Sequence, residues 1–164
     1  MTEIIARLAD ISARYDAVFC DLWGCLHNGV APFPPAVAAL RDFCAKGGKV
    51  ILLTNAPRPK SSVIKQLDGM GVPRDCWDDV VTSGDAAQYA MLTGAVGRKL
   101  HHIGAPKDMP FFSDFADDLA QVAATQPPFT LVPLTEAEGI ICTGLADDLN
   151  ETPDDYRATL LMAK

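Results

Sequence analysis

The most informative segment of the sequence is Val18-Phe19-Cys20-Asp21-Leu22-Trp23-Gly24-Cys25-Leu26-His27-Asn28-Gly29. Its first residues form a short apolar run, the pattern of a β-strand that is buried on both faces of a sheet. The run ends at Asp21, and Gly24 and Gly29 then indicate sharp turns of the chain. In open α/β sheets, ligands bind beyond the carboxyl ends of the strands. A carboxylate in that position can coordinate a hard cation or attack a phosphorus centre.

A second apolar run occupies residues 49–53 and ends at Thr54 and Asn55. Between the two runs, residues 35–45 carry apolar side chains at helical spacing, and a pair of glycines follows to end the helix. A strand–helix–strand unit forms a right-handed crossover, which places its two strands in the same parallel sheet. We therefore expect Asp21, Thr54 and Asn55 to lie together at one edge of that sheet.

These features resemble the haloacid dehalogenase (HAD) superfamily, in which a strand ending in Asp-x-x-Gly, a flap, a helix and a strand ending in Thr-Asn form the first two motifs. Within it the sequence is most similar to the class IIA phosphatase-like group, which carries a large α/β cap. Residues 81–87 resemble the segment that enters this cap, and residues 140–144 and 152–156 resemble a later strand and helix of it. The resemblance implies an α/β protein, with a Rossmann-like HAD core over residues 1–86 and the first part of the cap over residues 87–164.

The resemblance also assigns roles to individual residues. Asp21 matches the nucleophile that forms an aspartyl-phosphate, and Thr54 matches the motif II hydroxyl that holds the transferring phosphoryl group. Mg²⁺ would bind the Asp21 carboxylate and the backbone carbonyl of Trp23. The residues expected to contact the substrate or its phosphate are Trp23, Gly24, Asn55 and Arg58. The implied function is a magnesium-dependent, phosphatase-like hydrolase that acts on a small phosphorylated metabolite.

The sequence departs from the family pattern in two ways. The usual first motif is Asp-x-Asp, whose second aspartate transfers protons, and Trp23 stands in that place. The lysine of motif III and the acidic pair of motif IV have no counterpart, so we expect the chain to be an N-terminal fragment that is inactive alone. The alternative is a non-catalytic module with a HAD-like core that binds a phosphoryl ligand or has a regulatory role.

Four side chains allow more than one interpretation. Arg58 opens the next helix, where free N–H groups favour an anion, so both a phosphate contact and a solvated loop position stay open. His27 could replace the missing proton donor, because its ordinary pKa is near the working pH, but we interpret it as a surface or turn residue. His101 and His102 are adjacent on an expected strand and therefore point to opposite faces, which argues against a metal pair.

The remainder of the sequence predicts further alternation of helices and strands. An apolar stripe from Ile4 to Ile11 has helical spacing, so we expect an N-terminal helix there. Strands are expected at residues 80–82, 99–103, 129–132 and 139–143, and helices at residues 83–92, 111–124 and 153–164, besides one that starts near Ser61.

Composition excludes several classes of partner. A net charge of −7 over 164 residues does not favour nucleic acid or an acidic membrane surface. No apolar run is long enough for a membrane span, and the first residues do not form a signal peptide. The five cysteines are odd in number and include no Cys-x-x-Cys pair, which favours reduced thiols and a cytoplasmic location. Because the first apolar strand would be left at an edge, we expect the 164 residues alone to be poorly soluble or to form a homo-oligomer.

Overall fold

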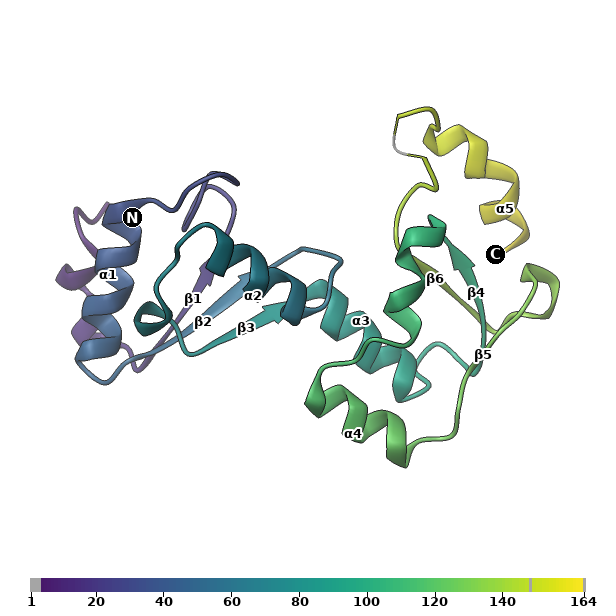
Figure 1. Ribbon diagram of the computed structural model, residues 1–164, viewed down its shortest axis with the longest axis horizontal. Coiled ribbons are helices and arrows are strands. Elements are labelled where there is room, and N and C mark those ends of the chain that lie inside the picture. Colours follow the sequence, from purple (N-terminus) through teal and green to yellow (C-terminus); the bar gives the residue numbers. More distant parts are fainter. Residues whose placement is uncertain (1–3, 148, 164) are drawn as a thin grey trace. The chain divides into compact units, whose positions relative to one another are not determined.

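The computed structural model describes residues 4–147 and 149–163, and the chain divides into two compact units between Ser83 and Gly84 (Figure 1). Each unit has its own three-stranded parallel sheet and its own hydrophobic core. The predicted α/β class is therefore confirmed. The assignment of residues 1–86 to a HAD core and of residues 87–164 to a cap stays a prediction.

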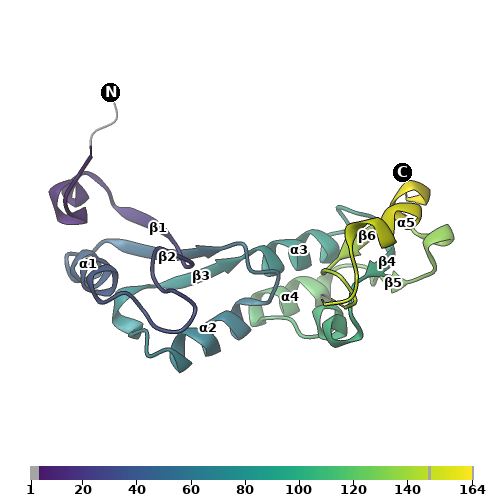
Figure 2. The same cartoon turned by 90° about the horizontal axis from the view of Figure 1, so that it is seen from above.

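The first unit is built on strands β1 (Ala17–Asp21), β2 (Lys49–Thr54) and β3 (Asp79–Thr82). They lie in the order β1-β2-β3, and both pairs are parallel. Helix α1 (Pro34–Ala45) connects β1 to β2, and helix α2 (Lys60–Gly69) connects β2 to β3. Because both connections are crossovers of the same hand, the two helices cover the same face of the sheet (Figure 2).

The core of the first unit lies between this face and the two helices. Val50 and Leu52 of β2 are fully buried, as is Val80 of β3 apart from a trace of surface. Apolar side chains of both helices pack against them; these are Val37, Leu40 and Phe43 of α1 and Val63 and Leu67 of α2. The helical spacing of these residues was visible in the sequence, and the predicted crossover is confirmed.

The opposite face of the first sheet is open. Phe19 is 71% exposed, and Leu53 and Val81 are 47% and 42% exposed. The expectation that the run at residues 18–20 is buried on both faces is wrong, because burial in β1 alternates and no helix of the described residues covers the outer face. The expectation of an apolar edge is confirmed, since β1 ends the sheet and pairs only with β2 in the described part of the chain.

Asp78 forms hydrogen bonds that stabilise the amino end of this sheet. Its Oδ1 accepts a hydrogen bond from Lys49 Nζ at 2.7 Å, and its Oδ2 accepts one from the backbone N–H of Val50 at 2.8 Å. These contacts, the bond from Lys49 above all, hold the pKa of the Asp78 carboxyl below its usual range. The interaction joins the start of β2 to the residue before β3, at the end of the sheet opposite Asp21.

The second unit is built on strands β4 (Lys99–Ile103), β5 (Thr130–Leu131) and β6 (Gly139–Cys142). They lie in the order β5-β4-β6, with both pairs parallel. Helices α3 (Ser83–Leu92), α4 (Asp117–Thr125) and α5 (Arg157–Met162) accompany them. The core gathers apolar side chains from α3, α4, the sheet and the segment between β4 and α4: Met91, Leu92, Leu100, Phe111, Phe112, Leu119 and Ile141.

One polar side chain is completely enclosed in this second core. Gln88 of α3 is 0% exposed, and its amide Nε2 donates to the backbone carbonyls of Phe111 and Asp114 at 2.9 and 3.0 Å. These bonds tie α3 to the segment that precedes α4. Since one buried and one partly buried carbonyl accept from this amide, Gln88 is a structural residue of the second unit.

Three expected helices differ from the structure. The apolar stripe from Ile4 to Ile11 forms two short 3₁₀ helices, Leu8–Asp10 and Ser12–Arg14, because Ile4 is 96% exposed and gains nothing from helical packing. The helix expected at residues 111–124 begins only at Asp117, because the two phenylalanines belong to the 3₁₀ helix Pro106–Phe112. The last helix likewise starts as the 3₁₀ helix Pro153–Tyr156, and its expected end at Lys164 lies outside the described residues.

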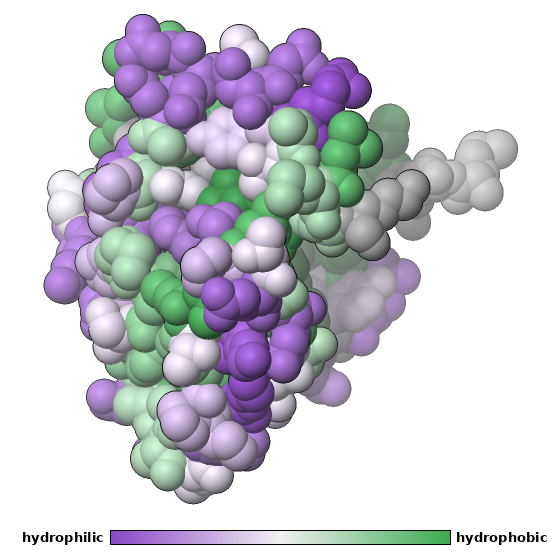
Figure 3. All heavy atoms as spheres, turned by 90° about the vertical axis from the view of Figure 1, so that its right-hand side faces the viewer, coloured by the Kyte–Doolittle hydropathy of each residue, from purple (hydrophilic) through white to green (hydrophobic). Residues whose placement is uncertain are grey.

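The surface mixes polar and apolar residues. Figure 3, which faces the second unit, shows hydrophobic residues interspersed among hydrophilic ones. No helix in the described ranges is long and apolar enough to cross a bilayer. All five cysteines are free; Cys76 is buried, whereas Cys25 and Cys142 are exposed.

Replacing Phe19 by lysine should reduce self-association of the 164-residue chain. The wild-type chain exposes an unpaired edge strand beside an open apolar face, and a charge there opposes edge-to-edge pairing. Light scattering after size exclusion should show the mass of the wild type rising with concentration and that of F19K rising less. Leu161→Lys, at a site of similar exposure on α5, is the control. A monomeric wild type at all concentrations would contradict this expectation.

Replacing Gln88 by leucine should destabilise the second unit by about 1–3 kcal/mol, because the carbonyls of Phe111 and Asp114 lose their donor and that of Phe111 stays buried. Urea unfolding followed by circular dichroism measures the change. The matched control is Gln121→Leu on the exposed surface of α4, for which a change within about 0.5 kcal/mol is expected. Equal midpoints for the two variants would rule out a structural role for the Gln88 amide.

Candidate functional site

The carboxyl ends of β1 and β2 bring three of the predicted residues together. In the parallel register Asp21 lies opposite Leu53, which directly precedes Thr54. Asp21 is exposed, whereas Thr54 is only 7% exposed. The Thr54 Oγ1 accepts the backbone N–H of Ala56 at 3.2 Å, which turns the chain at Asn55 and leaves the hydroxyl proton free to be donated. The predicted convergence of Asp21, Thr54 and Asn55 is therefore present.

The chain reverses immediately after Asp21. The Oδ1 of this carboxylate accepts the backbone N–H of Leu22 at 2.7 Å, so one of its oxygens is anchored to the turn. The carbonyl of Leu22 then accepts the N–H groups of Leu26 and His27 at 2.9 and 3.1 Å. Gly24 stands within this turn at a φ of +75°, where residues with a Cβ are strained, and its N–H donates to the His27 carbonyl.

A cleft of about 420 Å³ opens beside these strand ends. It is lined by Leu22, Trp23, His27, Thr54, Asn55, Ala56, Pro57, Arg58, Val63 and Gln66. Four of the predicted site residues thus share one cavity, namely Trp23, Thr54, Asn55 and Arg58. Asp21 lies at the adjacent strand end without lining the cavity, and Gly24 shapes the loop without lining it either.

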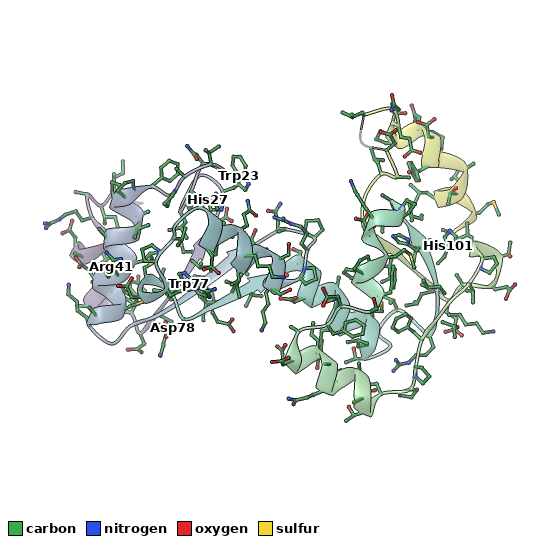
Figure 4. The ribbon with its side chains drawn as sticks, in the orientation of Figure 1. Trp23, His27, Arg41, Trp77, Asp78 and His101 are labelled. Carbon is green, nitrogen blue, oxygen red and sulfur yellow. The ribbon has the colours of Figure 1, made fainter. Side chains whose placement is uncertain are left out.

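Trp23 is 66% exposed and forms one wall of the cleft (Figure 4). Its ring meets the ring of His27 nearly edge-on, with centroids 6.0 Å apart and planes at 66°. The indole also covers Gly29, where a Cβ would come within 2.6 Å of the ring, and the φ of Gly29 is +89°. Gly29 is therefore required both by the close approach of Trp23 and by its own backbone conformation.

His27 is the residue that the sequence interpretation placed wrongly. It is 2% exposed and lines the cleft, so it is neither a surface residue nor a simple turn residue. Its Nδ1 accepts the backbone N–H of Gly29 at 3.0 Å. Burial lowers the pKa of the imidazole, and the nearby Asp21 carboxylate opposes this by a smaller amount.

The Arg58 side chain forms a hydrogen bond with a residue of α2. Its Nη2 donates to Oε1 of Gln66 at 2.6 Å, and both side chains line the cleft. Gln66 was not identified from the sequence, because a single half-buried glutamine on a helix gives no signal. The bond holds a positive charge at the cleft wall, where an anionic ligand would gain from it.

The oxygen atoms at and near Asp21 are of the kind that binds magnesium, but there are too few of them for a complete site. The Asp21 carboxylate and the Trp23 backbone carbonyl are hard donors, and Mg²⁺ commonly uses one or two carboxylates together with water and substrate phosphate. Across residues 4–147 and 149–163, no group of three or more histidine, cysteine or acidic side chains is placed to hold a metal ion. This part of the chain thus offers two donors for Mg²⁺ and not a complete site.

The two adjacent histidines of the second unit bond separately. His101, labelled in Figure 4, places Nδ1 3.1 Å from the carbonyl of Val132. His102 places Nε2 2.9 Å from Oγ1 of Thr143, which itself donates to Asp108 at 2.8 Å. Burial lowers the pKa of His102. The two rings therefore form hydrogen bonds with different segments of the second unit.

Solved structures with this fold come from several bacteria. A haloacid dehalogenase-like hydrolase from Brucella suis is 43% identical, with a TM-score of 0.77 over 97% of this chain and 56% of that one. The magnesium complex of a glycerol phosphate phosphatase from Mycobacterium tuberculosis is 22% identical, with a TM-score of 0.57 over 93% of this chain and 42% of that one. NagD from Escherichia coli is 21% identical, with a TM-score of 0.56 over 91% and 51% of the two chains.

The chain thus spans about half the length of the solved structures that it matches. No curated protein matches it significantly. The family model described as haloacid dehalogenase-like hydrolase matches residues 18–115, more than half of the sequence, beginning at the strand that ends in Asp21. This chain belongs to the haloacid dehalogenase-like hydrolase family.

Proposed function

We propose that the protein containing this chain is a magnesium-dependent phosphatase that acts on a small phosphorylated metabolite through an aspartyl-phosphate. The observation that carries the proposal is the placement of the Asp21 carboxylate and the Thr54 hydroxyl at adjacent parallel strand ends, beside one cleft. Because the chain spans about half of the matched structures, the activity is proposed for the polypeptide that the intact open reading frame encodes.

Asp21 would act as the nucleophile. Its Oδ1 is anchored by the Leu22 N–H, so the second carboxylate oxygen is the one free to attack phosphorus. As that O–P bond forms, the bond from phosphorus to the leaving oxygen breaks, and the leaving oxygen keeps the electron pair and takes a proton from water. Water then attacks the aspartyl-phosphate, which releases inorganic phosphate, returns the carboxylate and gives its proton to solvent.

Thr54, Asn55 and Arg58 would hold the phosphoryl group during this transfer. The Thr54 oxygen accepts the N–H of Ala56, which leaves the hydroxyl proton available to donate to a phosphoryl oxygen. The backbone N–H of Asn55 comes next along the chain, just past the end of β2. The Arg58 guanidinium adds a positive charge to the lining of the same cleft. Donors that are fixed before reaction stabilise charge as it develops on phosphoryl oxygens.

Magnesium bound to the Asp21 carboxylate and the Trp23 carbonyl would neutralise charge on the phosphoryl oxygens. The phosphatase from Mycobacterium tuberculosis, which shares this fold, was solved with magnesium. The remaining ligands would be water, substrate oxygens and groups outside the residues described here.

A second function is favoured by one observation. Trp23 stands where the family's proton-transferring aspartate would be, and an indole cannot protonate a leaving group. A module that binds a phosphoryl ligand without hydrolysing it would need the Thr54, Asn55 and Arg58 side of the cleft but no acid. Under this alternative, the protein binds a phosphate mimic such as beryllium fluoride, yet turns over no phosphomonoester.

Asp21→Asn should abolish the hydrolysis of 4-nitrophenyl phosphate by the protein translated from the intact reading frame, because an amide cannot form the aspartyl-phosphate. Initial rates with Mg²⁺ measure the loss. Asp79→Asn is a matched control: the Asp79 Oδ1 also accepts the next backbone N–H, at 2.8 Å against 2.7 Å for Asp21, but at the amino end of β3. Retention of activity in D21N would refute the nucleophile, and equal loss in D79N would indicate misfolding.

Trp23→Asp should raise turnover of phosphomonoesters with poor leaving groups, by up to about 10²–10⁴-fold if the scaffold is catalytic and lacks only a proton donor. Alkyl phosphates should gain more than 4-nitrophenyl phosphate, whose leaving group needs no protonation. Trp23→Asn removes the contacts with His27 and Gly29 without supplying an acid, so it separates packing from proton transfer. No gain for any substrate would favour the binding module.

A further inference from the structure

The flap after β1 contains a buried donor that the mechanism above does not use. His27 is 2% exposed, yet it lines the same cleft as Thr54, Asn55 and Arg58. Figure 4 shows it beside Trp23, on the loop that follows β1. A buried polar side chain on the wall of a ligand cleft needs an explanation, because burial without full hydrogen bonding costs stability.

The hydrogen bond from Gly29 fixes the proton on the imidazole. A backbone N–H can only donate, so Nδ1 of His27, 3.0 Å from the Gly29 nitrogen, must be the acceptor and carry no proton. The ring proton of the neutral imidazole is therefore on Nε2. The tautomer is set by the backbone of the loop and does not depend on a ligand.

The Nε2 atom of His27 is left available to a ligand. Among the described residues, the fully buried side-chain nitrogen and oxygen atoms that lack a partner are Trp77 Nε1 and Gln88 Oε1. No partner for Nε2 of His27 is found in residues 4–147 and 149–163 either, so this atom keeps accessible surface although the residue as a whole is buried. The accessible N–H belongs to a residue whose remaining surface is packed against the flap.

We infer that His27 is a hydrogen-bond donor of the phosphate site and that its Nε2–H binds a non-bridging oxygen of the phosphoryl group, which rests on the function proposed above. A neutral imidazole N–H is too weak an acid to protonate a leaving group, so its contribution is a fixed dipole. The residues that share its cleft are the ones proposed to hold phosphoryl oxygens, which favours a non-bridging oxygen over the leaving oxygen.

Two substitutions separate the functions of the two ring nitrogens. Asparagine places an oxygen near the position of Nδ1, so His27→Asn keeps an acceptor for the Gly29 N–H but loses the distal donor. Glutamine places its amide nitrogen near the position of Nε2, so His27→Gln keeps the donor but loses the acceptor. His101→Gln is the control, because His101 also bonds through Nδ1 but belongs to the second unit.

The experiment measures thermal melting, kcat/KM for 4-nitrophenyl phosphate and for an alkyl phosphate, and direct binding of orthovanadate by calorimetry, with the protein translated from the intact reading frame. H27N should melt close to the wild type but lose about 10–100-fold in both kcat/KM and vanadate affinity. H27Q should melt at a lower temperature than the wild type but keep kcat/KM and vanadate affinity within a few fold of the wild-type values. H101Q should leave kcat/KM and vanadate affinity unchanged.

The outcomes distinguish this inference from the proposed function. If D21N retains the activity of the wild type, or the wild type has none, the proposed hydrolase fails, and vanadate affinity alone still tests the donor. If D21N is inactive but H27N keeps wild-type kcat/KM and vanadate affinity, the role of His27 is overturned. A loss in H27N confined to substrates with poor leaving groups, with vanadate affinity intact, also overturns it.

Discussion

The candidate site depends on the parallel pairing of β1 with β2. This ladder sets Asp21 opposite Leu53 and thereby places a carboxylate next to a threonine that lies more than thirty positions later in the sequence. A shift of one residue would turn every side chain of β1 to the other face of the sheet. The covered face of β2, with Val50 and Leu52 under the two helices, opposes such a shift. The Asp78 contacts with Lys49 and Val50 fasten the far end of the same strand.

Much of this arrangement was predictable because it follows from local rules. Apolar runs ending in Asp21 and Thr54, with a periodic helix between them, permit few topologies other than a parallel crossover. The sequence also showed that Gly24 and Gly29 mark turns, and the structure gives both a positive φ. By contrast, the stripe from Ile4 to Ile11 was misleading, because helical spacing predicts a helix only where a surface exists to cover its apolar side.

The burial of His27 could not be predicted for a different reason. It depends on Trp23 crossing over Gly29, a contact between side chain and backbone within a loop, and no periodic pattern describes such a loop. The link between Arg58 and Gln66 is similar, because it joins a residue two positions before α2 to a half-buried side chain within that helix. The residues at the strand ends could therefore be predicted from the sequence, whereas the side-chain contacts that line the cleft became evident only from the structure.

The flap after β1 is held mainly by its own backbone: the Leu22 carbonyl accepts three N–H groups, and Gly24 and Phe33 donate to the carbonyls of His27 and Leu26. None of these bonds uses the side chain at position 23. The carbonyl proposed to meet magnesium is likewise independent of that side chain. The backbone of the loop can therefore keep its path with either an acid or an indole at position 23, so the proton-transferring group is separable from the architecture that positions the rest of the site.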